Sequence, residues 1–135
     1  MRTRREFFLK LFVWIAAIGW GVSVLGTFLS WNLVQAFLRW AGEMDTAVTD
    51  PMIQYWVRGA AGIGAVIGFL FLCCAVNPKK YAVLLPVLAW CSIFESIVIL
   101  WSGLALSLSP FPFLGDAGFC LITGIGILLS LPRRR

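Results

Sequence analysis

Histidine is absent from this sequence, and charged residues make up only 13% of its 135 positions. Histidine is the side chain used most often for proton transfer near neutral pH, so the usual acid–base sites and serine–histidine–aspartate triads are excluded. The sequence also contains no phosphate-binding glycine loop followed by lysine and no paired zinc-ligand motif. We therefore expect no catalytic residues, no metal site and no cofactor, and a function other than that of an enzyme.

Cysteine is scarce, and the four cysteines do not form a metal-binding or disulfide pattern. Cys73, Cys74, Cys91 and Cys120 all lie inside apolar runs, without the second pair that a zinc site requires. We expect them to act as small buried apolar side chains.

Apolar residues dominate the rest of the chain and account for 61% of it. A soluble domain of this length could not bury so much apolar surface, so lipid must solvate much of it. The net charge of +5 comes from lysines and arginines in short clusters beside apolar runs. That placement is typical of membrane proteins, and we do not expect a nucleic acid as a partner. The sequence predicts an all-α, polytopic membrane protein with the lipid bilayer as its surroundings.

Four apolar runs are long enough to cross a bilayer as helices. They cover about residues 7–30, 52–76, 81–106 and 116–131, and together they predict a four-helix bundle that forms one integral membrane domain over residues 1–135. Asp50 followed by Pro51 predicts the start of the second helix, because an acceptor side chain precedes a proline suited to the first helical position. The proline-broken segment 107–115 is expected to connect the last two helices.

The first run follows a basic start, and Gly19-Trp20-Gly21 could serve as a signal-peptide cleavage site. Because the apolar run continues well past that site, we expect it to remain as a membrane helix.

Residues 31–42, WNLVQAFLRWAG, carry Asn32, Gln35 and Arg39 at helical spacing among apolar residues. This pattern predicts a short helix in the membrane interface, with Trp31 and Trp40 at headgroup depth. The alternative is a simple extension of the first membrane helix.

The basic clusters predict how the chain is threaded through the membrane. They stand before the first span, between the second and third spans at Lys79 and Lys80, and after the fourth span at residues 133–135. With four crossings, all three clusters fall on one side. The positive-inside rule then places both termini in the cytoplasm, in a cytoplasmic or inner membrane.

Besides Lys10, which lies close to the start of the first span, three charged residues lie within or at the ends of the predicted spans: Arg58, Glu95 and Asp116. Ionisable groups at membrane depth are costly, so each needs a partner or access to water. Asp116 fits a helix cap better than a ligand.

Helical periodicity adds polar neighbours to these charges. Gln54 shares a face with Arg58, and Ser92 and Ser102 share a face with Glu95. Two interpretations stay open. Arg58 and Glu95 form an ion pair that fixes the packing, or the polar residues line an outward-open pocket for the headgroup of a lipid, a quinone or another amphiphile.

Small residues form a ridge on the second predicted helix. Ala60, Gly64 and Gly68 follow one another at single-turn spacing and include a GxxxG match. This ridge is either a packing seam within the chain or a seam against a second copy or another membrane subunit.

Several short stretches resemble a known family. They are Tyr55-Trp56-Val57-Arg58-Gly59-Ala60-Ala61-Gly62, Asn77-Pro78-Lys79-Lys80-Tyr81, Pro110-Phe111-Pro112 and Gly115-Asp116. Their order along four spans resembles that of the small bacterial four-helix membrane proteins, most of them uncharacterised, that are called DoxX-like. The resemblance implies a four-helix bundle in a bacterial cytoplasmic membrane and implies no activity.

Two functions remain as expectations. The first is a non-enzymatic interaction subunit or scaffold, held to a second copy or to a larger membrane complex by the small-residue ridge. The alternative is a binder or carrier of an amphiphilic small molecule, a lipid or a quinone, in a polar pocket in the outer half of the bundle.

Overall fold

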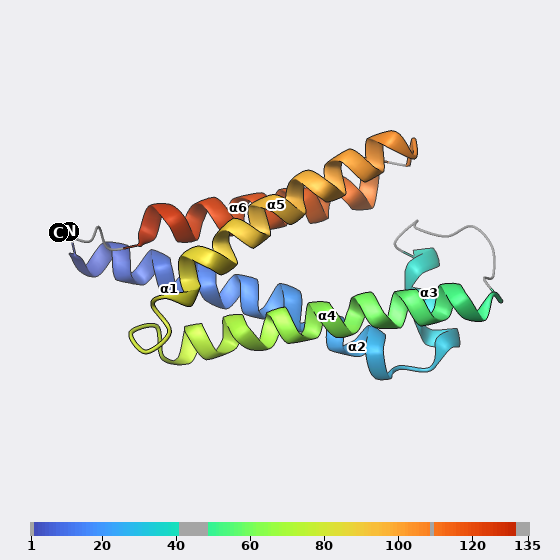
Figure 1. Cartoon of the computed structure of the whole chain (residues 1–135), viewed down its shortest axis with the longest axis horizontal. Helices are drawn as coiled ribbons and strands as arrows, with labels where there is room; N and C mark the ends of the chain where they lie inside the picture. The colour runs from blue at the N-terminus through green and yellow to red at the C-terminus, as the bar shows by residue number, and fades with distance from the viewer. Residues whose placement is uncertain (1, 41–48, 109, 132–135) are drawn as a thin grey trace.

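The computed structural model describes residues 2–40, 49–108 and 110–131 of the chain. Over these ranges the protein is all-helical, as the sequence predicts, and no strand occurs in them (Figure 1). The helices are α1 (Arg2–Gly21), α2 (Ser23–Phe28), α3 (Trp31–Trp40), α4 (Pro51–Val76), α5 (Leu84–Ala105) and α6 (Pro110–Ser130).

Four helical segments of the described chain are long and apolar enough to cross a membrane. They are Arg4–Phe28, Pro51–Val76, Leu84–Ala105 and Phe113–Ser130. The number agrees with the four predicted spans. The first of them is interrupted, because α1 ends at Gly21 and α2 begins at Ser23.

The start of α4 is the one the sequence predicts. The Asp50 side chain accepts a hydrogen bond from the Met52 backbone N–H at 2.8 Å, and Pro51 occupies the first turn. At the other end of α4, the Asn77 side chain accepts from the Lys80 backbone N–H at 3.1 Å, which reverses the chain toward α5.

The start of α6 differs from the prediction. The helix begins at Pro110, within the segment expected to be a connection. Proline is favoured in the first helical turn, where its missing N–H costs no hydrogen bond. The preceding helix ends sharply: Ser107 has a φ of 52°, and the Leu108 N–H donates to the Gly103 carbonyl at 3.0 Å, a common helix stop.

A separate α3 follows the first span. Leu29 has an extended backbone with ψ 153°, which breaks the helix before Trp31. The chain therefore does not continue the first membrane helix through residues 31–40, and that alternative is wrong.

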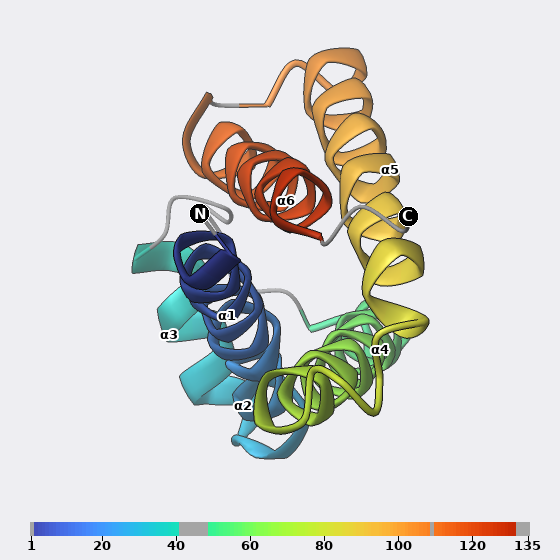
Figure 2. The same ribbon diagram turned by 90° about the vertical axis from the view of Figure 1, so that its left-hand side faces the viewer.

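The helices pack as two arms. The first arm consists of α1 and α2 against α4, and the second consists of α5 against α6, with α1 also contacting α6. By contrast, α4 and α5 touch each other at only a few residues. Figures 1 and 2 show that these two helices leave the turn at residues 77–83 in diverging directions.

The two ends of the molecule therefore differ. The closed end contains the start of α1, the turn at residues 77–83 and the end of α6 (Figure 1). The open end contains α2, the start of α4, the end of α5 and the start of α6 (Figure 1). Lys79 and Lys80 lie at the closed end together with the start of α1, as predicted, while the basic cluster at residues 133–135 lies outside the described residues.

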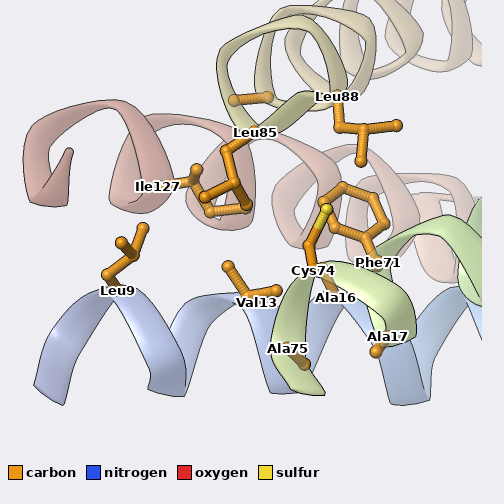
Figure 3. Close-up of a cluster of buried hydrophobic side chains, with 11 residues drawn as sticks. Leu9, Val13, Ala16, Ala17, Phe71, Cys74, Ala75, Leu85, Leu88 and Ile127 are labelled. Atoms are coloured by element: carbon orange, nitrogen blue, oxygen red, sulfur yellow. The ribbon is translucent and has the colours of Figure 1, made fainter. Parts of the chain in front are cut away.

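The main core lies where all four long helices meet (Figure 3). Its buried members are Leu9, Val13, Ala16, Ala17, Phe71, Cys74, Ala75, Leu85, Leu88, Ala89 and Ile127. Figure 3 shows Val13 from α1, Cys74 from α4 and Leu85 from α5 directed into the same cluster. This core joins the two arms.

Glycines set how closely α1 and α6 approach. Phe119 of α6 packs directly on Gly19, and Phe12 of α1 packs directly on Gly126. A Cβ atom at Gly126 would lie 2.6 Å from the Phe12 ring, so a larger residue there would displace that ring. Each helix thus offers one phenylalanine and one glycine to the other.

The cysteines follow the prediction in part. Cys74 and Cys120 are buried, Cys73 is half-buried, and all four thiols are free. Cys91 is exposed, so the expectation that it is buried is wrong.

Candidate functional site

Arg58 binds the end of the first span. It lies about two turns into α4, and its Nη1 donates to the Thr27 carbonyl at 2.9 Å while its Nη2 donates to the Leu29 carbonyl at 3.2 Å. Both carbonyls lie at the carboxyl end of α2, where helical carbonyls lack partners within the helix and carry partial negative charge. The guanidinium therefore fastens α4 to α2.

The proposed ion pair between Arg58 and Glu95 is not formed. The two residues belong to different arms, on helices that touch at only a few residues, and Arg58 turns to carbonyls of its own arm. Gln54 lies one turn before Arg58 on α4 and is half-buried. The structure thus does not bring Gln54 and Arg58 into one site with Glu95.

Glu95 and Asp116 do lie in one neighbourhood, on the second arm. Both carboxyl groups lie in the vicinity of the buried Cys120 of α6. Glu95 is half-buried on α5, and Asp116 is exposed. Within the described chain, neither carboxylate has a hydrogen-bond or ion-pair partner. Asp116 stands in the second turn of α6 because that helix starts at Pro110, so the expectation that it caps the helix is wrong.

Of the three serines of α5, Ser92 and Ser96 are buried, whereas Ser102 is half-buried. The Ser92 hydroxyl is buried and donates to the Leu88 carbonyl of its own helix at 3.1 Å. The Ser96 hydroxyl is buried and donates across to the Ala117 carbonyl of α6 at 2.7 Å. Ser102 is half-buried and takes no part in this contact face. Sequence reasoning missed Ser96, although its position one turn after Ser92 could have indicated it.

The GxxxG seam packs inside the chain. A Cβ atom at Gly68 would lie 2.5 Å from the Gly21 backbone nitrogen, and one at Gly64 would lie 2.7 Å from Ser23 Oγ. Both glycines are buried against the junction of α1 and α2. Of the two interpretations of this ridge, the structure shows packing within the chain at Gly64 and Gly68, while Ala60 is exposed.

One flank of α5 carries an uncovered stripe. Cys91, Glu95, Val98 and Ser102 follow one another at successive turns, so they share a side of the helix. Cys91 and Val98 are exposed, and the other two are half-buried. We call these four residues the α5 stripe. It differs from the face that α6 covers, where Ser92, Ser96 and Gly103 are buried.

A half-open groove lies on the outer part of α4. It has a volume of about 510 Å³ and is lined by Tyr55, Trp56, Arg58, Gly59, Ala60 and Ile63. We call it the α4 groove. In the sequence, the groove corresponds to the small residues Gly59 and Ala60, which lie between the aromatic pair Tyr55-Trp56 and Ile63. The GxxxG pattern does not indicate it, because that pattern starts at Gly64.

No metal site is found among the described residues, since no three of their cysteine and acidic side chains gather closely enough to hold an ion. The chain matches no protein-family model, no curated protein and no solved structure at a significant level. The resemblance to DoxX-like proteins therefore stays a prediction.

Proposed function

We propose that this protein is a four-span membrane protein that acts as a non-enzymatic interaction subunit. In this proposal each long apolar helix crosses the bilayer once, the closed end faces the cytoplasm, and α3 lies in the outer interface. The four long apolar helices support the crossing, and the lysines at the turn after α4 support the orientation.

The observation that carries the proposal is the position of Glu95. The residue lies about 16 Å along α5 from Leu84, and if α5 crosses the bilayer this is near the middle of a hydrocarbon core about 30 Å thick. A carboxylate at that depth costs about 3 kcal/mol in insertion experiments. Glu95 has no partner in the described chain, so a group outside the chain that neutralises it would recover much of this cost.

The surroundings of Glu95 suit another helix. Its neighbours on the α5 stripe are Cys91, Val98 and Ser102, none of them aromatic, and Cys91 and Ser102 are small enough to allow a close approach. The other exposed flank of α5 carries Trp90, Phe94 and Trp101, which are bulky and suit contact with lipid. The favoured partner is therefore a transmembrane helix with a lysine or arginine near its middle.

A second copy of this chain is a poorer partner for the stripe. Its Arg58 is held by the carbonyls of Thr27 and Leu29, and it lies toward the open end rather than at the depth of Glu95. The turn at residues 77–83, which includes Lys79 and Lys80, lies at the closed end (Figure 1). The charges thus favour a different protein over self-association.

The proposal is tested with synthetic helices. The protein, labelled with a donor fluorophore, is placed in phosphatidylcholine vesicles together with an apolar transmembrane peptide that has one central lysine and an acceptor fluorophore. Fluorescence resonance energy transfer from the protein to the peptide measures binding. We expect this peptide to bind about tenfold more tightly than a companion with leucine at that position. The difference disappears in Glu95→Gln and persists in Glu6→Gln, which removes an exposed carboxylate near the start of α1.

Three results would contradict the proposal. The first is equal binding of both peptides to the wild-type protein. The second is discrimination that survives Glu95→Gln. The third is stronger energy transfer between two copies of the protein than between the protein and the lysine peptide, which would make a second copy the occupant.

A further inference from the structure

The α4 groove contains one charged side chain, Arg58, beside a surface that is otherwise apolar or aromatic. The groove measures about 510 Å³ and is open to the surroundings along one side, so it suits an extended acyl chain better than an enclosed ligand. Because α4 alone lines the groove, the groove faces the surroundings of the protein rather than its core. No other described part of the chain fills it.

No described acidic side chain neutralises the charge of Arg58. Two of its five N–H groups donate to the Thr27 and Leu29 carbonyls, which are neutral acceptors. The remaining donors have no partner in the described chain. A guanidinium binds phosphate through parallel hydrogen bonds, so a phosphate oxygen fits the unused donors and the unpaired charge.

The depth of the groove agrees with a lipid phosphate. At 1.5 Å per residue, α4 is about 39 Å long, roughly 9 Å more than the hydrocarbon core. If the lysines after α4 hold its inner end at the headgroups, this excess lies at the start of the helix. Tyr55 and Trp56 then lie at headgroup level, and Arg58 lies just below them, within reach of the phosphates.

The glycine in the groove, Gly59, has no role in packing among the described residues. A Cβ atom at Gly59 would have no atom within 4 Å, in contrast to the tightly packed Gly64 and Gly68. Glycine is unfavourable in a helix compared with alanine. Its small size at this position is explained if an acyl chain lies along Gly59 and Ala60.

We propose that the α4 groove binds an anionic phospholipid of the outer leaflet, with its phosphate on Arg58 and an acyl chain across Gly59 and Ala60. The charge favours a lipid with a net negative headgroup, because the choline of phosphatidylcholine competes with Arg58 for the phosphate. This site lies on a different arm from the α5 stripe, so either can fail without the other.

The test compares two glycine variants by native mass spectrometry. Dioleoyl phosphatidylglycerol is titrated into the purified full-length protein in detergent, and the dissociation constant of the first bound lipid is measured. Gly59→Leu fills the groove, whereas Gly62→Leu places the same side chain on a neighbouring glycine that does not line it. At neither position would a Cβ atom meet another described residue, so both variants are expected to fold.

We expect Gly59→Leu to weaken binding of the first phosphatidylglycerol by about tenfold and Gly62→Leu to leave it unchanged. Arg58→Gln is expected to weaken it similarly, and dioleoyl phosphatidylcholine to bind the wild-type protein less tightly. Excess inorganic phosphate should not displace the lipid, because it lacks the acyl chain. Wild-type affinity in Gly59→Leu, or equal affinity for the two lipids, would overturn the proposal.

Discussion

At the closed end, side chains from four helices fill one core, whereas at the open end the two arms present their polar residues on separate faces. Phe71, Leu85 and Ile127 are almost completely buried where the arms join. Toward the open end, Arg58 and Glu95 lie on different arms and do not pair. The contrast indicates that stability resides mainly at the closed end, while the groups that need partners lie away from it.

The same contrast separates two sets of glycines on α4. Gly64 and Gly68 are buried because they allow the backbone of α4 to approach the junction of α1 and α2. Gly59 and Gly62, nearer the open end, would have open space around a Cβ atom. A GxxxG spacing alone does not distinguish these sets, so a glycine-rich helix must be interpreted from its contacts.

The largest expected effect is at the core of the closed end. Phe71→Ala removes a fully buried ring and should lower the free energy of unfolding by about 3 kcal/mol, because neighbouring helices cannot close the cavity. Phe94→Ala removes a ring that is 66% exposed and should change it by less than about 0.5 kcal/mol. Unfolding in detergent, followed by circular dichroism, measures both. Equal losses would remove the distinction between core and periphery.

The next largest effect concerns the glycines. Gly68→Leu places a side chain against the Gly21 backbone, which cannot move aside, and should cost about 2 kcal/mol or more. Gly59→Leu should leave the unfolding midpoint unchanged. The same unfolding measurement compares the two variants. Tolerance of leucine at Gly68 would show that α1 and α4 do not approach closely.

A smaller effect is expected where α5 meets α6. Ser96→Ala removes the hydrogen bond to the Ala117 carbonyl and leaves that acceptor buried, which should cost about 1 kcal/mol. Ser102→Ala is the matched control on the α5 stripe and should change the unfolding free energy little. If both variants unfold alike, the bond across the two helices contributes nothing.

The last prediction concerns the reactivity of the cysteine thiols rather than stability. Cys91 faces the detergent, whereas Cys74 and Cys120 are buried inside the bundle, so a maleimide that dissolves in the detergent should modify Cys91 before these two, although the apolar surroundings slow the reaction at all three thiols. Mass spectrometry of digested protein identifies the modified thiols. The lysine peptide that binds the α5 stripe should slow modification of Cys91. Rapid modification of Cys120 would contradict the packing of α6.

Much of the fold could be predicted from the sequence because run length and charge position are local properties. The four long helices and the start of α4 after Asp50 agree with the prediction. The turn that contains the two lysines also lies at the same end of the molecule as the start of α1, as predicted (Figure 1). The division between α1 and α2 at Val22 is not marked in the sequence, since no proline lies there. The start of α6 was missed because its prolines were interpreted as breakers rather than as first-turn residues.

The candidate site was harder to predict, and Arg58 shows why. A sequence displays charged side chains, so a carboxylate was the obvious partner for a membrane arginine. Its actual partners are the backbone carbonyls of Thr27 and Leu29, which every residue possesses and no residue type marks. They accept from Arg58 only because α2 ends beside α4. The proximity of α2 to α4 depends on the tertiary structure, and so does the separation of Arg58 from Glu95.

The most direct test compares the separation of α4 and α5 at the two ends of the molecule. Pairs of cysteines for spin labels are introduced into a variant without native cysteines, which is studied in lipid nanodiscs. One variant carries labels at positions 76 and 87, near the closed end, and the other carries them at positions 53 and 104, near the open end. Double electron–electron resonance then measures the distance between the two labels in each variant. The structure predicts a clearly longer distance for the open-end pair. Equal distances would mean that the helices run parallel and close along their whole length, with Glu95 covered by its own chain.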